Sequence, residues 1–157
     1  YIMKGNEKVI ETLNNLLSDE LTAISQYMVH AEMCDNWGYV KLAEKIEKRA
    51  IDEMKHAEKH IGRILFLEGK PIVSQLGKIY IGQDVLTLLK NDHVAEEEAI
   101  KAYNEAIKLV SDIGDNGTCD FLAGILGDEE EHIGWVETQL GQIDQIGIQT
   151  YLVEQVG

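Results

Sequence analysis

One short pattern, Glu-x-x-His, occurs twice in this chain and constrains its fold more than any other feature. Residues three apart share one face of a helix, so each copy offers a carboxylate and an imidazole to the same point. A lone glutamate precedes each copy by the same 33 residues. The six residues are Glu20, Glu53, His56, Glu96, Glu129 and His132. A pattern repeated at one spacing predicts two similar helical hairpins.

Composition favours helices throughout. The chain has 157 residues with one proline and 6% aromatic residues, and its frequent Ala, Leu, Glu and Lys are strong helix formers. A chain of this length is expected to form a single domain, residues 1–157, with a sizeable core. The formal net charge of −14 argues against a nucleic-acid partner, because phosphates require a basic surface. It fits a protein that attracts cations.

The sequence shows no feature of export or membrane insertion. No stretch approaches the roughly 20 apolar residues of a membrane span, and the N-terminus lacks the basic-then-apolar plan of a signal peptide. Cys34 and Cys119 do not form a metal-binding pair, and we expect them to be reduced thiols. A cytoplasmic protein is the resulting expectation.

Apolar residues at helical spacing predict four long helices and one short one. Their ranges are about 6–35, 40–67, 84–113, 118–141 and 148–156. Asn6 is a suitable N-cap for the first, while Gly69 and Pro71 should stop the second. Residues 69–83, fully extended, would span about 50 Å, against about 45 Å for a 30-residue helix. The second and third helices are therefore expected to be parallel, joined by one long crossover.

The glutamates of the pattern stand in apolar stripes, where a surface glutamate does not belong. Glu20 lies in the middle of the apolar face of the first helix. Of three consecutive glutamates in the third helix, only Glu96 falls on the apolar face. Two hairpins packed face to face would bring all six residues to the middle of one bundle. Four buried carboxylates cost several kcal/mol each, and two divalent cations would offset their charge.

The donor types narrow the choice of metal. Carboxylates with two imidazoles suit iron or manganese better than thiol-seeking metals. The alternative is that the six polar side chains satisfy one another by hydrogen bonds without a metal.

The apolar stripes contain few positively charged residues that could balance the glutamates. Arg49 is the exception, and we expect it to pair with a carboxylate. A tyrosine also follows each lone glutamate by seven residues, at Tyr27 and at Tyr103.

The second helix carries a second apolar cluster, about 115° around the helix from Glu53. Its members are Val40, Ala43, Ala50, Ile51, Met54, Ile61 and Leu65. A surface helix of a monomer needs one apolar face, so a second face indicates a subunit interface with Met54 near its middle. The alternative is a wide helix face that belongs entirely to the core.

The chain resembles the bacterioferritins over nearly its whole length. The six residues match the constellation of ferritin-like di-metal carboxylate proteins, and the similarity extends to further stretches. These are Met3-Lys4-Gly5 and residues 31–38, 51–57, 64–69 and 128–133. The resemblance implies an all-α, ferritin-like four-helix bundle with one long crossover and a short fifth helix. It also implies a homo-oligomeric shell of 24 subunits that stores iron.

The resemblance divides the six residues into two bridging glutamates and two terminal Glu–His pairs. In that order they are Glu53 and Glu129, Glu20 with His56, and Glu96 with His132. Together they would form a di-iron ferroxidase centre, which oxidises Fe(II) to Fe(III) with oxygen or hydrogen peroxide before mineral forms inside the shell. A ferredoxin-type partner would return electrons to the stored iron.

Two further residues gain roles from the resemblance. A methionine at the position of Met54 ligates haem, either haem b or a related porphyrin, with one haem shared across each two-fold dimer. A methionine in an apolar stripe is otherwise usually packing. Tyr27 matches a tyrosine beside the centre, where it would serve electron transfer or hydrogen bonding. The alternative for Tyr27 is a simple core tyrosine.

The chain also departs from some bacterioferritins at the inner surface of the shell. Lys48 stands where they have a histidine and Gly134 where they have an acid, while Asp52 remains. An auxiliary iron site on the inner surface is therefore in doubt.

Two other functions stay open. A haem-bearing cage subunit, structural or electron-transferring, would leave iron oxidation to partner subunits, but the intact set of six ligands argues against it. A non-cage di-iron or di-manganese peroxidase of the rubrerythrin type usually carries a Cys-x-x-Cys iron domain, which is absent from this sequence.

Overall fold

The structure is a computed structural model that describes residues 4–157. Five helices lie within these residues. They are α1 (Glu7–Asn36), α2 (Val40–Phe66), α3 (Val85–Ile113), α4 (Asn116–Ile146) and α5 (Ile148–Val153). The all-α class is confirmed, and the first three helices lie within one residue of the expected ranges. Met3 of the Met3-Lys4-Gly5 stretch lies outside the described residues.

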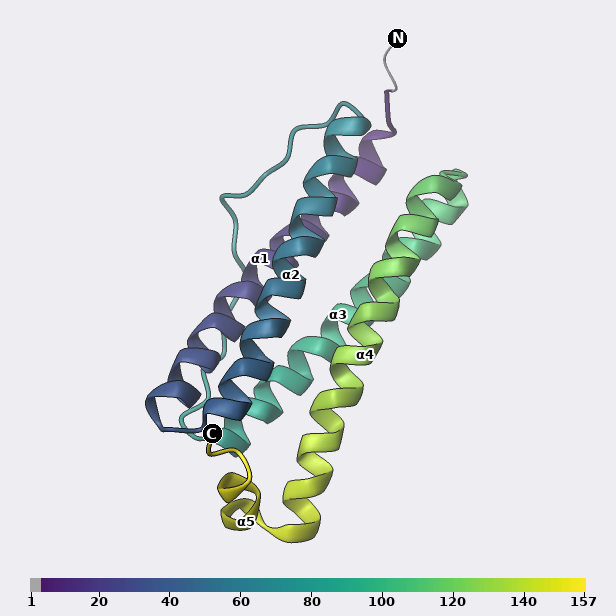
Figure 1. Ribbon diagram of the computed structural model, residues 1–157. Coiled ribbons are helices and arrows are strands. Elements are labelled where there is room, and N and C mark those ends of the chain that lie inside the picture. The colour runs from purple at the N-terminus through teal and green to yellow at the C-terminus, as the bar shows by residue number, and fades with distance from the viewer. Residues whose placement is uncertain (1–3) are drawn as a thin grey trace.

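The four long helices form two antiparallel hairpins, α1 with α2 and α3 with α4 (Figure 1). Helix α1 packs toward α3, and α2 meets α4. The segment between α2 and α3 runs along the outside of the first hairpin from one end to the other (Figure 1). Helices α2 and α3 therefore point the same way, as the length of this crossover predicted.

Side-chain caps begin three of the four long helices. Asn6, Asp84 and Asp115 accept hydrogen bonds from backbone N–H groups of the first turns of α1, α3 and α4, at 2.8, 2.8 and 3.1 Å. Each cap satisfies one of the N–H groups that a helix start leaves without a partner. The N-cap role expected for Asn6 is thus observed.

The end of α2 differs in detail from the sequence expectation. The helix ends at Phe66, and Glu68 adopts the left-handed conformation with φ 63°, which a residue other than glycine adopts only at a cost. The Gly69 N–H then donates to the Ile64 carbonyl at 2.8 Å. Gly69 is required for space, because a Cβ there would lie 2.6 Å from Cγ2 of Ile10.

Helix α4 is longer than expected at both ends, and α5 is shorter. The predicted range 118–141 ended at Gly141, but α4 continues to Ile146 and stops where Gly147 adopts φ 83°. Burial of Ile143 in the core explains the continuation, since packing of an apolar face overrides the weak helix propensity of one glycine. Tyr151 of α5 is also buried and donates to Gln139 Oε1 of α4 at 2.7 Å.

A buried polar network attaches the crossover to the bundle. The N–H of Tyr80 donates to Gln26 Oε1 at 3.1 Å, and the N–H of Gly82 donates to His30 Nε2 at 3.0 Å. Because His30 Nε2 accepts, its Nδ1–H donates to Asp92 at 2.8 Å, and Gln26 donates to the same oxygen at 3.0 Å. The crossover is therefore held through α1 to α3.

Two apolar clusters lie on either side of a polar layer in the middle of the bundle. One contains Leu13, Leu17, Ile64 and Leu122, and the other contains Leu42, Ile46, Leu88, Leu89 and Tyr151. No helix among residues 4–157 is long and apolar enough to cross a membrane. The candidate site occupies the polar layer.

Candidate metal centre

The structure brings the six residues of the repeated pattern together in the polar layer. All six are buried: Glu20, Glu53, His56, Glu96, Glu129 and His132. Helices α1 and α3 each supply one glutamate, and α2 and α4 each supply a Glu-x-x-His pair. Within each hairpin, the lone glutamate and the Glu-x-x-His pair are about equally far from the turn. All six residues therefore lie at the same level along the axis of the bundle.

The six side chains form two overlapping groups of donors. One group is Glu20, Glu53, His56 and Glu129, and the other is Glu53, Glu96, Glu129 and His132. Within each group the four donor atoms lie within 4.8 Å of one another. Because both groups contain Glu53 and Glu129, the geometry suits two adjacent metal ions that share two carboxylates.

Several atoms of the centre have no hydrogen-bond partner although they are buried. They are the carboxylate oxygens Glu20 Oε2, Glu96 Oε2 and Glu129 Oε2. A buried acceptor without a partner costs about 1–3 kcal/mol, so a protein core does not collect three of them at one point without compensation. Divalent cations at the two positions would satisfy these atoms, and the donor set therefore fits a di-metal centre.

Electrostatics inside the cluster also favour cations. Burial, followed by the charge of Glu53, raises the pKa of Glu20, and burial with the neighbouring Glu129 raises the pKa of Glu96 to about 8. Burial alone would lower the pKa of His132, but the carboxylates of Glu129 and Glu53 raise it to about 10. Without metal, the cluster therefore retains protons that bound cations would displace.

Each imidazole is held from behind by an aspartate of the opposite hairpin. His56 Nε2 lies 2.9 Å from Asp128 Oδ2, and His132 Nε2 lies 3.2 Å from Asp52 Oδ2. This leaves both Nδ1 atoms to face the centre, the arrangement that orients metal-binding histidines. The sequence interpretation missed these partners, although both copies of the pattern read Asp-Glu-x-x-His.

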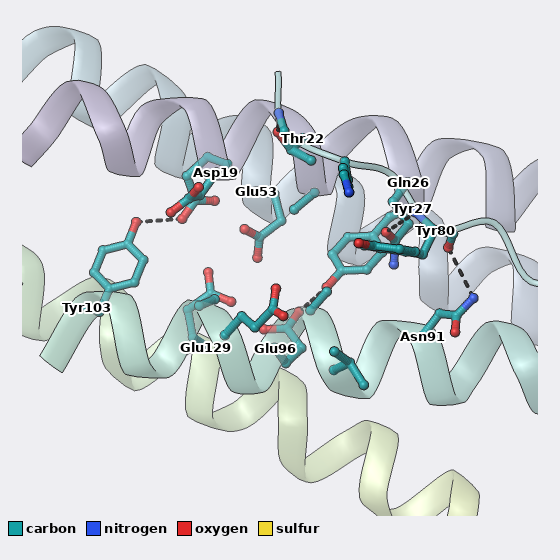
Figure 2. Close-up of a pocket in the computed structure, with 18 residues that line it drawn as sticks. Asp19, Thr22, Gln26, Tyr27, Glu53, Tyr80, Asn91, Glu96, Tyr103 and Glu129 are labelled. Atoms are coloured by element: carbon teal, nitrogen blue, oxygen red, sulfur yellow. Dashed lines mark hydrogen bonds between the residues drawn. The ribbon is translucent and has the colours of Figure 1, made fainter. Parts of the chain in front are cut away.

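The two tyrosines of the sequence pattern also cross between hairpins. Tyr27 of α1 donates to Glu96 Oε1 of α3 at 2.5 Å, and Tyr103 of α3 donates to Glu20 Oε1 of α1 at 2.5 Å. Figure 2 shows Tyr27 and Tyr103 at opposite ends of the carboxylate cluster. Tyr103 had no predicted role, and the seven-residue spacing was the available signal.

Arg49 pairs with Glu96. Its Nη2 donates to Glu96 Oε1 at 2.8 Å, and its Nη1 lies 3.8 Å from Asp92 Oδ2. The guanidinium also stacks 4.3 Å from the centre of the Tyr27 ring. The expectation that Arg49 contacts a carboxylate is thus met, and the partner is one of the six clustered residues.

Two cavities approach the centre from opposite sides. One, of about 500 Å³, lies between α1, α3 and the crossover and reaches Glu53, Glu96 and Glu129 (Figure 2). The other, of about 320 Å³, lies over the backs of the two imidazoles and is lined by Lys45, Lys48, Lys55 and Lys59. Asp52 borders this second cavity and is already engaged with His132.

Met54 lies on α2 away from the cluster. It is 45% exposed, and Ile51 and Leu65 on the same face of α2 are 41% and 58% exposed. Ala43 and Ala50, which the sequence interpretation assigned to the same outer face, are buried in the core. The second apolar face is therefore narrower than expected, because its small residues pack inside the subunit.

Comparisons with known proteins agree with this architecture. The fold and the paired donor groups are those of a ferritin-like protein, and the ferritin-like domain matches residues 10–146. The bacterioferritin of Rhodobacter capsulatus is 42% identical over 95% of this chain and 92% of its own length. The bacterioferritin of Mycobacterium tuberculosis is 37% identical over 98% of this chain and 97% of its own. The chain belongs to the bacterioferritin family, which supports a role in iron storage.

Proposed function

We propose that this protein is a ferroxidase that oxidises Fe(II) and stores the product as mineral inside a shell of 24 identical subunits. The observation that carries the proposal is the pair of four-donor groups sharing Glu53 and Glu129. Two Fe(II) ions held side by side supply two electrons together, which reduce one hydrogen peroxide to water or one dioxygen to peroxide. The iron is thus the substrate of the centre.

The roles of the residues follow from the two donor groups. Glu53 and Glu129 bridge the ions because they belong to both groups. The remaining members form the terminal pairs Glu20 with His56 and Glu96 with His132. Tyr27 holds Glu96 by its hydrogen bond, a positioning role that also leaves an oxidisable ring beside the centre.

Stopped-flow oxidation of Fe(II) tests the ferroxidase role. The intact protein is expected to oxidise about two Fe(II) ions per subunit in a first phase that is far faster than oxidation in buffer. Replacement of Glu20 and His132 by alanine should abolish this phase, because each terminal pair loses a ligand. An unchanged first phase in that double variant would show that the centre is misassigned.

Haem binding at Met54 is the second part of the proposal. An exposed thioether on the same face of α2 as the exposed Ile51 and Leu65 suits a two-fold interface in which two copies of Met54 ligate one porphyrin. The visible spectrum should show bis-methionine ligation, and Met54→Leu should lose haem. Met28→Leu is the matched control, since Met28 is also about half exposed. Full haem content in Met54→Leu would refute the assignment.

Assembly and reduction complete the proposal. We expect a cytoplasmic shell whose stored iron is released by electrons from a ferredoxin-type protein. Cys34 and Cys119 are free thiols, which agrees with a reducing compartment. The mass in solution, measured together with iron and haem content, tests the 24-subunit assembly, and a stable dimer as the largest species would contradict it.

A further inference from the structure

The two terminal glutamates of the centre have unequal neighbours. Glu96 Oε1 accepts two hydrogen bonds, one from the Tyr27 hydroxyl and one from the Arg49 guanidinium. Glu20 Oε1 accepts one, from the Tyr103 hydroxyl. The second oxygen of each glutamate is buried and free of hydrogen bonds. The two halves therefore match in ligands but differ in the charge behind them.

The positive charge of Arg49 acts mainly on Glu96. The side chain is 4% exposed, and its Nε and Nη1 have no hydrogen-bond partner, so its hydrogen bonding is directed to Glu96. Asp92 lies farther away, at 3.8 Å, and its other oxygen already accepts from Gln26 and His30. A charge-assisted hydrogen bond in a buried site is strong because solvent does not screen it.

The hydrogen-bond chain that reaches Glu20 Oε1 through Tyr103 is neutral. Behind the Tyr103 hydroxyl lies His60, whose Nε2 is 2.7 Å away. Burial lowers the pKa of His60 to about 3, so the imidazole carries no charge at neutral pH. Among residues 4–157, no lysine or arginine forms an ion pair with Glu20, whereas Arg49 pairs with Glu96.

We infer that the two metal positions are unequal, with the Glu20–His56 position binding divalent cations more tightly than the Glu96–His132 position. Arg49 is the positioning residue that sets the difference. Its guanidinium withdraws electron density from Glu96 and repels a cation bound there, while Tyr103 has no charge with which to do the same at Glu20. The inference rests on the proposed di-metal function and adds the order in which the two metal positions are filled. The weaker position then sets the Fe(II) concentration at which oxidation begins.

Anaerobic calorimetric titration of the metal-free assembled protein with Co²⁺ tests this order without measuring activity. We expect two binding events per subunit whose affinities differ at least tenfold. Glu20→Gln should remove or weaken the tighter event, and Glu96→Gln should do the same to the weaker event. The opposite assignment in these two variants would overturn the inference.

Two substitutions at Arg49 separate charge from packing. Arg49→Lys keeps the charge and should preserve the difference between the two events. Arg49→Gln removes the charge and should strengthen the weaker event about tenfold, so that the two affinities converge. If Arg49→Gln does not assemble because Asp92 loses its counter-charge, the double variant Arg49→Gln with Asp92→Asn restores neutrality and is expected to show the same convergence.

The outcomes distinguish the inference from the function on which it rests. Two equal events in the native protein, or an unchanged difference once the charge of Arg49 is removed, would overturn the inference alone. Fewer than two Co²⁺ ions bound per subunit would overturn the di-metal function together with the inference.

Discussion

The imidazoles of the centre are oriented by residues that belong to the opposite hairpin. Asp128 of α4 holds His56 of α2, and Asp52 of α2 holds His132 of α4. Each hydrogen bond fixes the ring so that Nδ1 faces the carboxylates. Because the bonds run between hairpins, they also resist a shift of α2 along α4, which would separate the two donor groups.

Asp128→Asn is expected to weaken metal binding at the Glu20–His56 position by about tenfold to a hundredfold, because an outer hydrogen-bond partner contributes about that much to affinity. The measurement is competition for Zn²⁺ with a chelator indicator. Glu131→Gln serves as the control, since Glu131 borders the same cavity but is exposed and forms no hydrogen bond or ion pair with either imidazole. An equal loss of Zn²⁺ affinity in both variants would indicate a general electrostatic effect of removing a negative charge from this cavity.

The crossover is an element without regular structure whose position depends on buried side chains of other elements. His30 is fully buried and joins the Gly82 N–H to Asp92. Thr22, nearer the surface, accepts the Gly77 N–H at 2.8 Å. The network continues from Asp92 to Arg49 and from there to Glu96. The crossover and the candidate metal centre are therefore parts of one polar assembly.

His30→Leu should lower the free energy of unfolding by about 1–3 kcal/mol, because it leaves the buried Gly82 N–H without its partner and removes one of the two donors to Asp92 Oδ1. It should also speed proteolytic cleavage within residues 69–83. Thr22→Val removes a solvent-exposed bond at the same segment and is expected to have a smaller effect on both measurements. A His30→Leu protein that resists protease as well as the native protein would show that other contacts hold the crossover.

The whole molecule combines a net charge of −14 with four carboxylates gathered at its centre. Without metal, protons and the two imidazoles compensate that central charge. The pKa of Glu96 is raised from 4.5 to about 8 by burial and by Glu129, and that of His132 from 6.5 to about 10 by Glu129 and Glu53 against the effect of burial. Between pH 7 and 9 the folded protein thus holds protons that the unfolded chain has released.

The metal-free protein should therefore unfold at a lower temperature as pH rises from 7 to 9. The stability that a raised pKa contributes is complete below the unfolded pKa and is lost as pH rises through the folded pKa. Thermal unfolding in the presence of a chelator measures this effect. Zn²⁺ should raise the midpoint and remove the decline, since the metal replaces the protons. A midpoint that rises with pH in the chelated protein would contradict these pKa shifts.

Much of the fold follows from local patterns that the chain carries along its length. Helical spacing of apolar residues places α1, α2 and α3 within one residue, because those helices end at strong turn signals. The end of α4 does not follow from such a signal. Gly141 resembles a stop, but burial of Ile143 extends the helix beyond it, and burial depends on neighbours that the local sequence does not contain.

For the candidate site too, some features follow from the sequence and others only from the tertiary structure. The order of amino acids alone decides which six donors meet, because equal spacing about two turns brings them to one height in any such pair of hairpins. The tertiary structure decides what stands behind each donor. Tyr27 lies two turns from Glu20 in the chain, yet it donates to Glu96, and Arg49 contacts Glu96 although it shares a helix with Glu53. A side chain on the inner face of a helix reaches across to the opposite helix, and only the packing of the two hairpins determines which carboxylate it meets.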